Sequence, residues 1–383
     1  MSTTMRSYSR RGILLGAGTG IVAGCVRSLA AAAPDWVSIT PAEGGFSADL
    51  EARLEQAITE GRVWGLHGVV IARAGRLVLE KYFEGPDDIE GRGPVGRVAF
   101  GPDTPHDLRS VTKCIVGLLY GIALAEGKVP YPEEPLLTRF PGYADVGATG
   151  GRDRLTVAHA LTMTLGTDWP EWGIPYSDPS NSETAMEAAL DRYRFILERS
   201  IIAEPGTKWI YNGGATALLG RLIANGTGKS LPEYARSALF APLGLDATQW
   251  ATGRDGEPKA ASGLSMVPRD LARIGQLVLQ DGAWQGRQLV PSSWLEASFR
   301  PAVTINEYRK YGYHWYLGEL NSDPPVASRR RRWIGGIGYG DQRLFIFPDL
   351  KLTVVITAGN YDRTDQAVGP INMIRQVILP SMI

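Results

Sequence analysis

Strand-like segments lie at both ends of this 383-residue chain, and helical segments lie between them. Early on, β-branched or alternating runs at 67–73 and 76–83 are joined by a short Ala-Gly turn, which is typical of a β-hairpin. Near the end, similar runs at 343–347 and 352–357 flank a second turn that contains Pro and Asp. Apolar residues at helical spacing, separated by Gly and Pro, occupy 110–126, 157–163, 183–199, 215–224 and 231–239. The pattern predicts an α+β fold in which both ends of the chain build one sheet and the middle forms a helical insertion.

The composition is that of a folded globular protein. Apolar residues make up 44% of the chain and charged residues 21%, which is incompatible with a mainly disordered protein. Lys plus Arg and Asp plus Glu each number 40, so the net charge gives no reason to expect nucleic acid or an anionic membrane as a partner. No apolar stretch reaches the ~18 residues that a transmembrane helix needs. We therefore expect a protein with no nucleic-acid partner and no membrane span.

The first 33 residues have the features of an export signal. Ser9-Arg10-Arg11 precedes an apolar, Gly-rich run over 13–23, which matches a twin-arginine signal, and an Ala-rich stretch follows at 30–33. Two processing routes remain open, namely cleavage at the Ala-rich stretch or lipidation at Cys25, which would leave a lipid anchor. We expect an exported, periplasmic protein.

The remainder of the chain is expected to divide into two parts. A sheet-containing α/β domain is predicted to combine 34–109 with 247–383, and a mainly helical domain is predicted to occupy 110–246 between them. Cys114 is the one cysteine outside the predicted signal, so we expect no internal disulfide.

Common hydrolase and cofactor signatures are missing. Neither Gly-x-Ser-x-Gly nor His-Glu-x-x-His occurs. The segment 226–230 resembles the end of a phosphate-binding loop, but Ile223 stands where that motif needs glycine and a helix precedes it, so we interpret it as a helix-ending turn. The four histidines lack metal-ligand spacing, which favours core or surface positions over a zinc site: His67, His106, His159 and His314. The sequence therefore predicts neither a metal nor a cofactor.

One Ser-x-x-Lys motif occurs in the chain, at Ser110 and Lys113. The apolar helical run that follows it places Ser110 at or near a helix N-terminus. Residues three apart on a helix share one side, so the lysine amine should lie beside the serine hydroxyl. A lysine desolvated in a cleft can lose its charge and accept the serine proton, which would activate an otherwise poor nucleophile. The backbone amides of the first turn favour developing negative charge nearby.

A second group is usually needed to carry the proton to the leaving group. Tyr211 lies in the Gly-rich turn 205–214, just before a predicted helix, where a phenol can be held at the edge of a cleft. Tyr211 is therefore our candidate for the proton shuttle.

Several ordered motifs between about 60 and 361 carry a resemblance to a known family. They are Leu108-Arg109-Ser110-Val111-Thr112-Lys113, Leu161-Thr162-Met163-Thr164, Pro205-Gly206-Thr207 through Tyr211, Leu239-Phe240-Ala241-Pro242-Leu243-Gly244, and Gly338-Tyr339-Gly340-Asp341-Gln342. Together they resemble the β-lactamase-related serine hydrolases: class C β-lactamases, D-alanyl-D-alanine carboxypeptidases, esterases with a β-lactamase fold and 6-aminohexanoate-dimer hydrolases. The resemblance implies a helical domain beside a five-stranded antiparallel sheet flanked by helices. It also implies Ser110 as nucleophile, Lys113 as general base and Tyr211 as proton shuttle.

One departure from the family pattern concerns the side chain that binds the substrate amide. Class C enzymes have Tyr-x-Asn, whereas Gly213 holds the Asn position here. Asn212 stands one residue early and should point elsewhere.

A second departure concerns the strand that closes the site. Related enzymes carry Lys-Thr-Gly or His-Thr-Gly there, and the cation recognises the substrate carboxylate. This chain has 333–336 or 338–340 at that place, depending on register, and neither offers Lys or His. A backbone amide of the strand can still complete an oxyanion hole with the amide of Ser110, because that role needs no side chain. We expect Tyr339 to supply this amide, with Gly336 as the alternative.

These departures favour esters or small amides over β-lactams. We predict an exported serine hydrolase that acts on a small-molecule ester, amide or peptide through an acyl-enzyme at Ser110. The alternative within enzymes is a β-lactamase or D-Ala-D-Ala carboxypeptidase. The alternative outside enzymes is a catalytically silent receptor that binds ligands in the same cleft.

Overall fold

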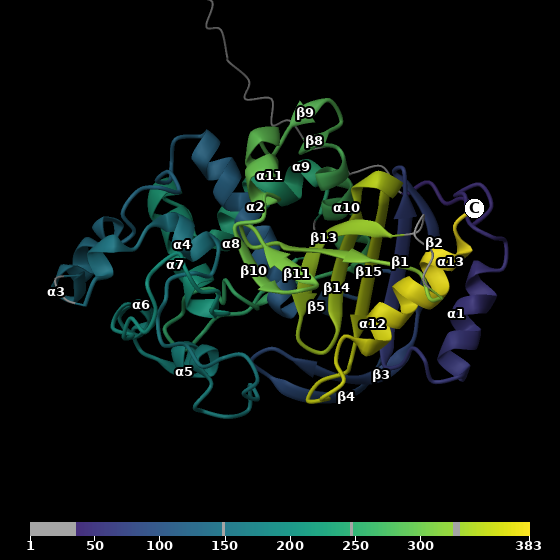
Figure 1. Ribbon diagram of the computed structural model, residues 1–383, viewed down its shortest axis with the longest axis horizontal. Coiled ribbons are helices and arrows are strands. Elements are labelled where there is room, and N and C mark those ends of the chain that lie inside the picture. The colour runs from purple at the N-terminus through teal and green to yellow at the C-terminus, as the bar shows by residue number, and fades with distance from the viewer. Residues whose placement is uncertain (1–35, 148–149, 246–247, 325–329) are drawn as a thin grey trace, which may run out of the picture. The chain divides into compact units, whose positions relative to one another are not determined.

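An eight-stranded antiparallel sheet forms the framework of the protein (Figure 1). The computed structural model describes residues 36–147, 150–245, 248–324 and 330–383. The order of strands in the sheet is β10-β11-β12-β13-β14-β15-β1-β2. Their bounds are β1 (Leu66–Arg73), β2 (Arg76–Tyr82), β10 (Val303–Asn306), β11 (Arg309–Tyr311), β12 (Tyr316–Leu320), β13 (Arg331–Gly338), β14 (Gln342–Phe347) and β15 (Leu352–Ala358).

Both predicted hairpins are confirmed. The first turn between β1 and β2 has Ala74 and Gly75 at positive φ, 50° and 77°, as a tight two-residue hairpin requires. The second hairpin joins β14 to β15 through a short helical turn. Strand β15 pairs with β1, with Val69 opposite Ile356. The two ends of the chain therefore meet in one sheet, as the sequence pattern predicts.

The sheet is larger than the five strands that the family resemblance implies. Three short strands, β10 to β12, continue it beyond β13. They alternate between buried and more exposed side chains, and the buried Tyr311 and Tyr316 face each other across β11 and β12. Aromatic and β-branched residues in alternation stabilise such edge strands through cross-strand contacts. The expectation of five strands is therefore wrong for this chain.

Helices cover both faces of the sheet because side chains alternate along each strand. On β1, Val70 packs into a core that includes α10, whereas Val69 and Ile71 pack into a second core with α1 and the C-terminal helical segment. The helices are α1 (Leu50–Thr59), α2 (Thr112–Ala125), α3 (Ala144–Gly147), α4 (Val157–Leu161), α5 (Ser182–Ala188), α6 (Arg192–Leu197), α7 (Gly213–Thr227), α8 (Leu231–Ala235), α9 (Ala241–Leu243), α10 (Pro268–Leu279), α11 (Ser292–Ser298), α12 (Val368–Asn372) and α13 (Leu379–Ser381).

Short elements complete the fold. Three small sheets lie outside the main one, formed by β3 (Glu84–Ile89) with β4 (Gly93–Ala99), by β5 (His106–Asp107), β7 (Leu264–Met266) and β6 (Gln249–Trp250), and by β8 (Ala283–Trp284) with β9 (Arg287–Gln288). Single turns of other helix types are η1 (Arg109–Val111), η2 (Leu137–Arg139), η3 (Pro141–Tyr143), η4 (Arg152–Arg154), η5 (Arg236–Phe240), η7 (Pro348–Leu350) and η8 (Met373–Ile378).

The middle of the chain is helical, as predicted, with one difference in detail. The segment predicted as a helix over 183–199 forms two helices, α5 and α6, because Ala189 is extended and the Asp191 side chain caps α6 by accepting from the Arg194 amide. Helix α7 ends at Gly228, whose φ is 67°, so the interpretation of 226–230 as a helix-ending turn is confirmed.

Two predictions about organisation stay predictions. The export segment 1–33, with both processing routes, lies outside the described residues. The described residues belong to one compact unit, so the division at 110 and 246 is not tested. Within the described ranges, we find no helix that combines the length and apolar character required to cross a bilayer.

Candidate active site

Ser110 and Lys113 lie together at the start of the central helix α2. Ser110 belongs to the single turn η1, and Lys113 is in the first turn of α2 that follows directly. Lys113 Nζ lies 3.1 Å from Ser110 Oγ and donates a further hydrogen bond of 3.0 Å to the carbonyl of Ala261. Ser110 is 8% exposed and Lys113 is 2% exposed. The expected pairing of the two side chains is therefore present, in a setting largely shielded from water.

The backbone immediately before Ser110 is strained. Arg109 has a φ of 47°, in the left-handed region that costs a non-glycine residue about 1–2 kcal/mol. Its guanidinium holds it there by donating to the carbonyl and carboxylate of Asp88, at 2.6 and 2.7 Å, and to Glu90. Asp107 adds a third carboxylate at 3.7 Å. Burial raises the pKa of Asp107 to about 6, against the lowering effect of Arg109.

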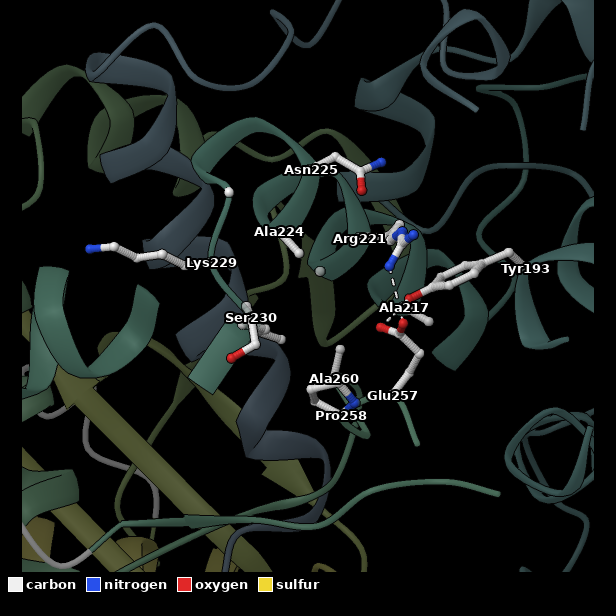
Figure 2. A pocket seen from close by; sticks show the side chains of 13 residues that line it. Tyr193, Ala217, Arg221, Ala224, Asn225, Lys229, Ser230, Glu257, Pro258 and Ala260 are labelled. Carbon is white, nitrogen blue, oxygen red and sulfur yellow. Dashed lines mark hydrogen bonds and ion pairs between the residues drawn. The ribbon is translucent and has the colours of Figure 1, made fainter. Parts of the chain in front are cut away.

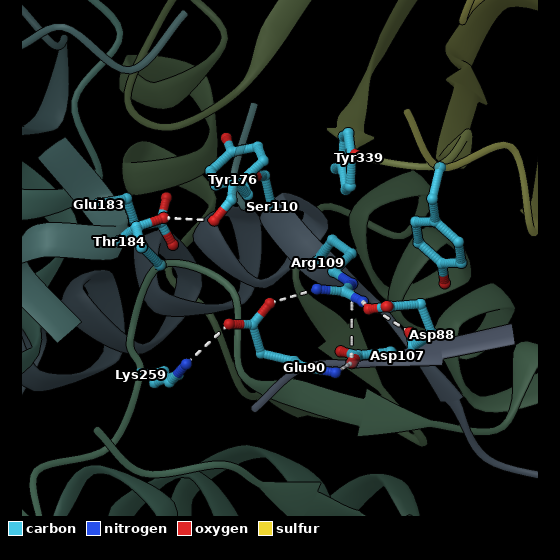
Figure 3. A network of polar contacts seen from close by, with 12 residues as sticks. Asp88, Glu90, Asp107, Arg109, Ser110, Tyr176, Glu183, Thr184, Lys259 and Tyr339 are labelled. Atoms are coloured by element: carbon cyan, nitrogen blue, oxygen red, sulfur yellow. Dashed lines mark hydrogen bonds and ion pairs between the residues drawn. The ribbon is translucent and has the colours of Figure 1, made fainter. Parts of the chain in front are cut away.

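This network continues around the site, as Figure 3 shows. Glu90 joins Arg109 on one side to Lys259 on the other, and the Lys259 Nζ to Glu90 Oε1 distance is 2.8 Å. Arg109 and Lys259 are thus each paired with a carboxylate. Ser110 follows Arg109 directly, so the network helps to position the backbone that carries the serine.

Tyr211 lies against Lys113, with the ammonium nitrogen 4.8 Å from the centre of the phenol ring. Burial, with the nearby carboxylates of Glu171 and Glu183, raises the pKa of Tyr211 well above its ordinary value, and a hydrogen bond with Ser110 acts in the opposite direction. The phenol is therefore protonated near neutral pH and can donate a proton. The structure brings all three candidate catalytic side chains, Ser110, Lys113 and Tyr211, into one cluster.

Asn212 points away from this cluster, as predicted. Its Oδ1 accepts a hydrogen bond from the Ala215 amide at the start of α7, and its Nδ2 donates to Thr167 Oγ1 at 3.1 Å. Asn212 is therefore a helix cap. The amide-binding position of class C enzymes is left to Gly213, which has no side chain.

Two buried carboxyl groups that the sequence analysis did not identify fill the space beside Gly213. A Cβ atom at Gly213 would lie 2.7 Å from Glu183 Oε2 and 3.3 Å from Glu171 Oε2. Glu183 Oε2 lies 3.8 Å from Lys113 Nζ. Glu171 lies in a loop and Glu183 in α5, so sequence spacing gave no signal that they meet; the glycine in place of asparagine was the available hint.

The β13 strand runs beside the turn that carries Ser110. A Cβ atom at Gly336 would lie 2.9 Å from Val111 Cγ1, and one at Gly338 would lie 2.6 Å from the Leu108 carbonyl. Glycine at both positions thus permits the close approach of strand and turn. Tyr339 follows at the end of β13. Its assignment as the second oxyanion-hole amide, with Gly336 as the alternative, stays a prediction.

Three tyrosine rings contact one another beside the Arg109 network. The Tyr339 ring lies 5.1 Å from that of Tyr176 and 5.6 Å from that of Tyr361, and its hydroxyl donates to Asp362. A cavity of about 510 Å³ lies here, lined by residues that include Arg109, Tyr176, Glu183, Lys259, Tyr339 and Tyr361. Since Arg109 adjoins Ser110 and Glu183 adjoins Lys113, this cavity opens next to the candidate nucleophile.

A second cavity, of about 280 Å³, lies elsewhere and is lined by α7, the turn after it and Pro258 (Figure 2). Its ion pair joins Arg221 to Glu257 at 3.0 Å, and Tyr193 donates to Glu257 at 3.1 Å. Lys229, from the turn that resembles a phosphate-binding loop, donates to Ser237 outside this group. None of the predicted site residues lines this cavity.

The fold brings two of the scattered histidines together. His67 Nδ1 and His106 Nε2 lie 2.8 Å apart, and Asp87 Oδ1 lies 3.9 Å from each. These three groups are the set in the described residues whose atoms could hold a metal ion. The two ring nitrogens share a hydrogen bond, whereas ligands of one tetrahedral zinc ion lie about 3.3 Å apart. As it stands, the cluster is closed by its own hydrogen bond, and we assign it no catalytic role.

A buried serine and lysine in hydrogen-bond contact, with a tyrosine beside them, are an arrangement typical of serine hydrolases. Comparison with known proteins agrees with this class. The profile of the family described as Beta-lactamase matches residues 50–374, so the chain belongs to the β-lactamase family.

Individual relatives are distant. The chain is 25% identical over 333 residues to 6-aminohexanoate-dimer hydrolase from Paenarthrobacter ureafaciens, covering 80% of this chain and 74% of that one. The structure of Beta-Lactamase/D-Alanine Carboxypeptidase from Pseudomonas syringae matches with a TM-score of 0.61 at 18% identity, covering 85% and 96% of the two chains. The structure of EstCE1, a hydrolase with promiscuous acyltransferase activity, matches with a TM-score of 0.64 at 16% identity, covering 85% of this chain and 96% of that chain. The last two show the shared fold.

Proposed function

We propose that this protein hydrolyses esters or small amides through an acyl-enzyme at Ser110. The observation that carries the proposal is the 3.1 Å contact between Lys113 Nζ and Ser110 Oγ in a buried site. In its uncharged form the lysine amine takes the Ser110 proton as Oγ attacks the substrate carbonyl. The oxyanion is held by the backbone amide of Ser110 and, as predicted from the sequence, that of Tyr339.

Attack on the carbonyl gives a tetrahedral intermediate, and its collapse breaks the bond between the carbonyl carbon and the leaving group. Tyr211 donates its proton to the departing oxygen or nitrogen and is reprotonated by the Lys113 ammonium. Water then attacks the acyl group on Ser110, and the same groups return the proton to Oγ. Every proton that leaves Ser110 or water is thus returned to the leaving group or to Ser110.

Two features favour esters or small amides over β-lactams. Arg109 and Lys259, the cations that line the cavity, are already paired with carboxylates, so neither is free to recognise a substrate carboxylate. Gly213 offers no side chain to bind a substrate amide. A relative that is 25% identical is named for hydrolysis of an amide, the 6-aminohexanoate dimer, which fits this preference.

The experiment is intact-protein mass spectrometry after incubation with p-nitrophenyl butyrate and, separately, with a penicillin. We expect a transient butyryl adduct that is lost in Ser110→Ala and retained in Ser237→Ala, a matched serine far from the site. A long-lived penicilloyl adduct without ester turnover would support the alternative, a penicillin-binding carboxypeptidase or β-lactamase. Failure of both reagents to label the protein would support a silent receptor and reject the enzyme.

We propose further that the protein is exported by the twin-arginine route. The proposal rests on Ser9-Arg10-Arg11 and the apolar run after it. Replacement of Arg10 and Arg11 by Lys should retain the protein in the cytoplasm, whereas Arg6→Lys should not. Lipid labelling that is lost in Cys25→Ser would select lipidation over cleavage, and unchanged export of the double variant would reject the route.

A further inference from the structure

The Glu183 carboxylate lies where a family member with asparagine at position 213 would place an amide side chain. At Gly213 a Cβ atom would be 2.7 Å from Glu183 Oε2 and 3.0 Å from its Cδ. An asparagine there could not be built without moving Glu183. Glycine at position 213 therefore leaves room beside the lysine for the Glu183 carboxylate, where an asparagine would put a neutral amide.

Glu183 is held in place from its backbone. The Asn181 side chain caps α5 by accepting from the Glu183 amide at 3.0 Å, and it donates to the carbonyls of Glu171 and Ile174 at 3.2 and 2.9 Å. Asn181 is fully buried. One side chain thus fixes both glutamates relative to each other.

Glu171 supports Glu183 from the other side. Its Oε2 accepts from the Trp169 indole and from the Gly213 amide, both at 2.7 Å, and its Oε1 accepts from the Tyr176 hydroxyl at 3.1 Å. Burial and the charge of Glu183 raise the pKa of Glu171 well above its ordinary value. Burial acts to raise the pKa of Glu183 too, but Lys113 and a hydrogen bond from Glu171 outweigh it and lower the pKa. The two carboxyl groups are coupled, and the lower pKa belongs to Glu183, whose Oε2 lies 3.8 Å from Lys113 Nζ, so the ion pair with Lys113 favours the negative charge on Glu183.

The charges around Glu183 come from five segments. The titratable groups that face it, from α2, from the loop before α5, from α5 itself, from the turn before α7 and from the segment after β6, are Lys113, Glu171, Tyr176, Glu187, Tyr211 and Lys259. Lys113 is the nearest cation, at 3.8 Å, while Lys259 is bonded to Glu90. Glu183 is therefore the counter-ion of Lys113.

We propose that Glu183 is the positioning residue of the Lys113 base, forming an acid–base–nucleophile series Glu183–Lys113–Ser110. The inference rests on the proposed function. When Ser110 gives its proton to the uncharged Lys113 amine, a positive charge forms on Nζ, and the Glu183 carboxylate stabilises it without taking the proton. A third group that orients and stabilises the base is the general arrangement of activated nucleophiles.

A purely structural carboxylate would behave differently from a counter-ion. Loss of a structural group lowers the fraction folded or the rate at all pH values alike. Loss of a counter-ion makes the protonated lysine less stable. The ammonium then loses its proton more easily, and the amine becomes a weaker base for the serine proton. The midpoint of the rising limb of the pH–rate profile then moves to lower pH while the plateau falls.

The experiment compares Glu183→Gln, Glu183→Asp and Glu257→Gln with the wild type. Glu257→Gln is the matched control, because it also removes a glutamate that pairs with a cation, but that cation is Arg221 and the pair lies in the other cavity. The readouts are the rate of butyryl-adduct formation and kcat/KM for p-nitrophenyl butyrate from pH 5 to 9, with thermal unfolding to monitor the fold. We expect Glu183→Gln to lower the acylation rate by about 10²-fold and to shift the midpoint of the rising limb of its pH–rate profile to lower pH. Glu183→Asp should recover part of the rate and part of the shift.

Two results would overturn the inference. One is a Glu183→Gln protein that acylates at the wild-type rate with an unchanged limb. The other is a folded Glu183→Gln protein whose rate falls at every pH with the limb in place, which is the behaviour of a structural group. Absence of a Ser110 adduct in the wild type would instead reject the proposed function, so the two failures can be told apart.

Discussion

Replacement of Lys113 by Met removes the cation nearest to the buried Glu183 carboxylate, so its effect on stability can be worked from the structure. Lys113 is 2% exposed, and Glu183 Oε2 lies 3.8 Å from its Nζ. Breaking a buried ion pair from one side typically costs about 3–5 kcal/mol, because the remaining charge has no partner. Met has nearly the volume of Lys, so little of this cost should come from a cavity.

The expected shift in melting temperature follows from the size of the protein. Unfolding entropy of about 2.1 cal/mol/K per residue over roughly 350 residues gives about 0.7 kcal/mol/K, so a loss of about 3–5 kcal/mol lowers Tm by about 4–7 °C at pH 7. In the wild type the lowered pKa of Glu183 stabilises the fold above the unfolded-state pKa of a glutamate, and this contribution is lost as the pH falls. In Lys113→Met the charge that most lowers the pKa of Glu183 is gone, and burial is opposed only by the hydrogen bonds with Glu171 and Ser262 and by the charge of Lys259, so that pKa rises. The penalty should therefore shrink toward pH 5.

A double variant separates charge from packing. Lys113→Met with Glu183→Gln leaves neither charge buried, so most of the lost stability should return at pH 7 although the enzyme stays inactive. The assay is thermal or urea unfolding of the wild type, both single variants and the double variant at pH 5 and pH 7. Equal stability of Lys113→Met and wild type at pH 7, or no recovery in the double variant, would refute the assignment of a charged Glu183 beside Lys113.

Three further changes test separate parts of the site and fold. Tyr211→Phe removes the proton donor and should lower kcat for amide hydrolysis by about 10²-fold with little change in Tm; an unaffected kcat would exclude the shuttle. Gly213→Asn forces a side chain into the position of Glu183, and overpacking should cost about 1–3 kcal/mol and most of the activity in esterase and unfolding assays. Gly228→Ala places a Cβ in the left-handed cap of α7, where open space leaves only backbone strain, so a loss of about 1 kcal/mol with unchanged activity is expected.

Local sequence signals predicted the elements that depend on neighbours in the chain. The Ala74-Gly75 turn and the Gly228 helix end each follow from backbone conformations that few residues adopt easily, and the structure has both. The contact of Ser110 with Lys113 follows in the same way from helical geometry. The number of strands in the sheet could not be predicted in this way. Strands β10 to β12 are three to five residues long and are stabilised by pairing within the sheet rather than by a local pattern.

The carboxylates beside Lys113 could not be predicted because their role depends on long-range placement. Glu171 and Glu183 lie 58 and 70 positions after Lys113 in the chain, and Asn181 rather than any spacing rule joins them. His67, Asp87 and His106 show the same limit, since three separate strands bring them together. A single sequence indicates which side chains can do chemistry, but the fold decides which of them meet.

The exchange of an amide for an acid beside the lysine also bears on which substrates the site can accept. A neutral amide at position 213 can both donate to and accept from a substrate amide, whereas a carboxylate only accepts and repels negative charge. When Lys113 is uncharged, as the proposed mechanism requires, and Arg109 and Lys259 are paired with carboxylates, a substrate carboxylate placed near Lys113 would be repelled by the Glu183 carboxylate. An uncharged acyl group would meet none. The same residue that we infer to stabilise the base would therefore disfavour the anionic substrates that β-lactamases and carboxypeptidases recognise, which links the proposed mechanism to the proposed preference for esters and small amides.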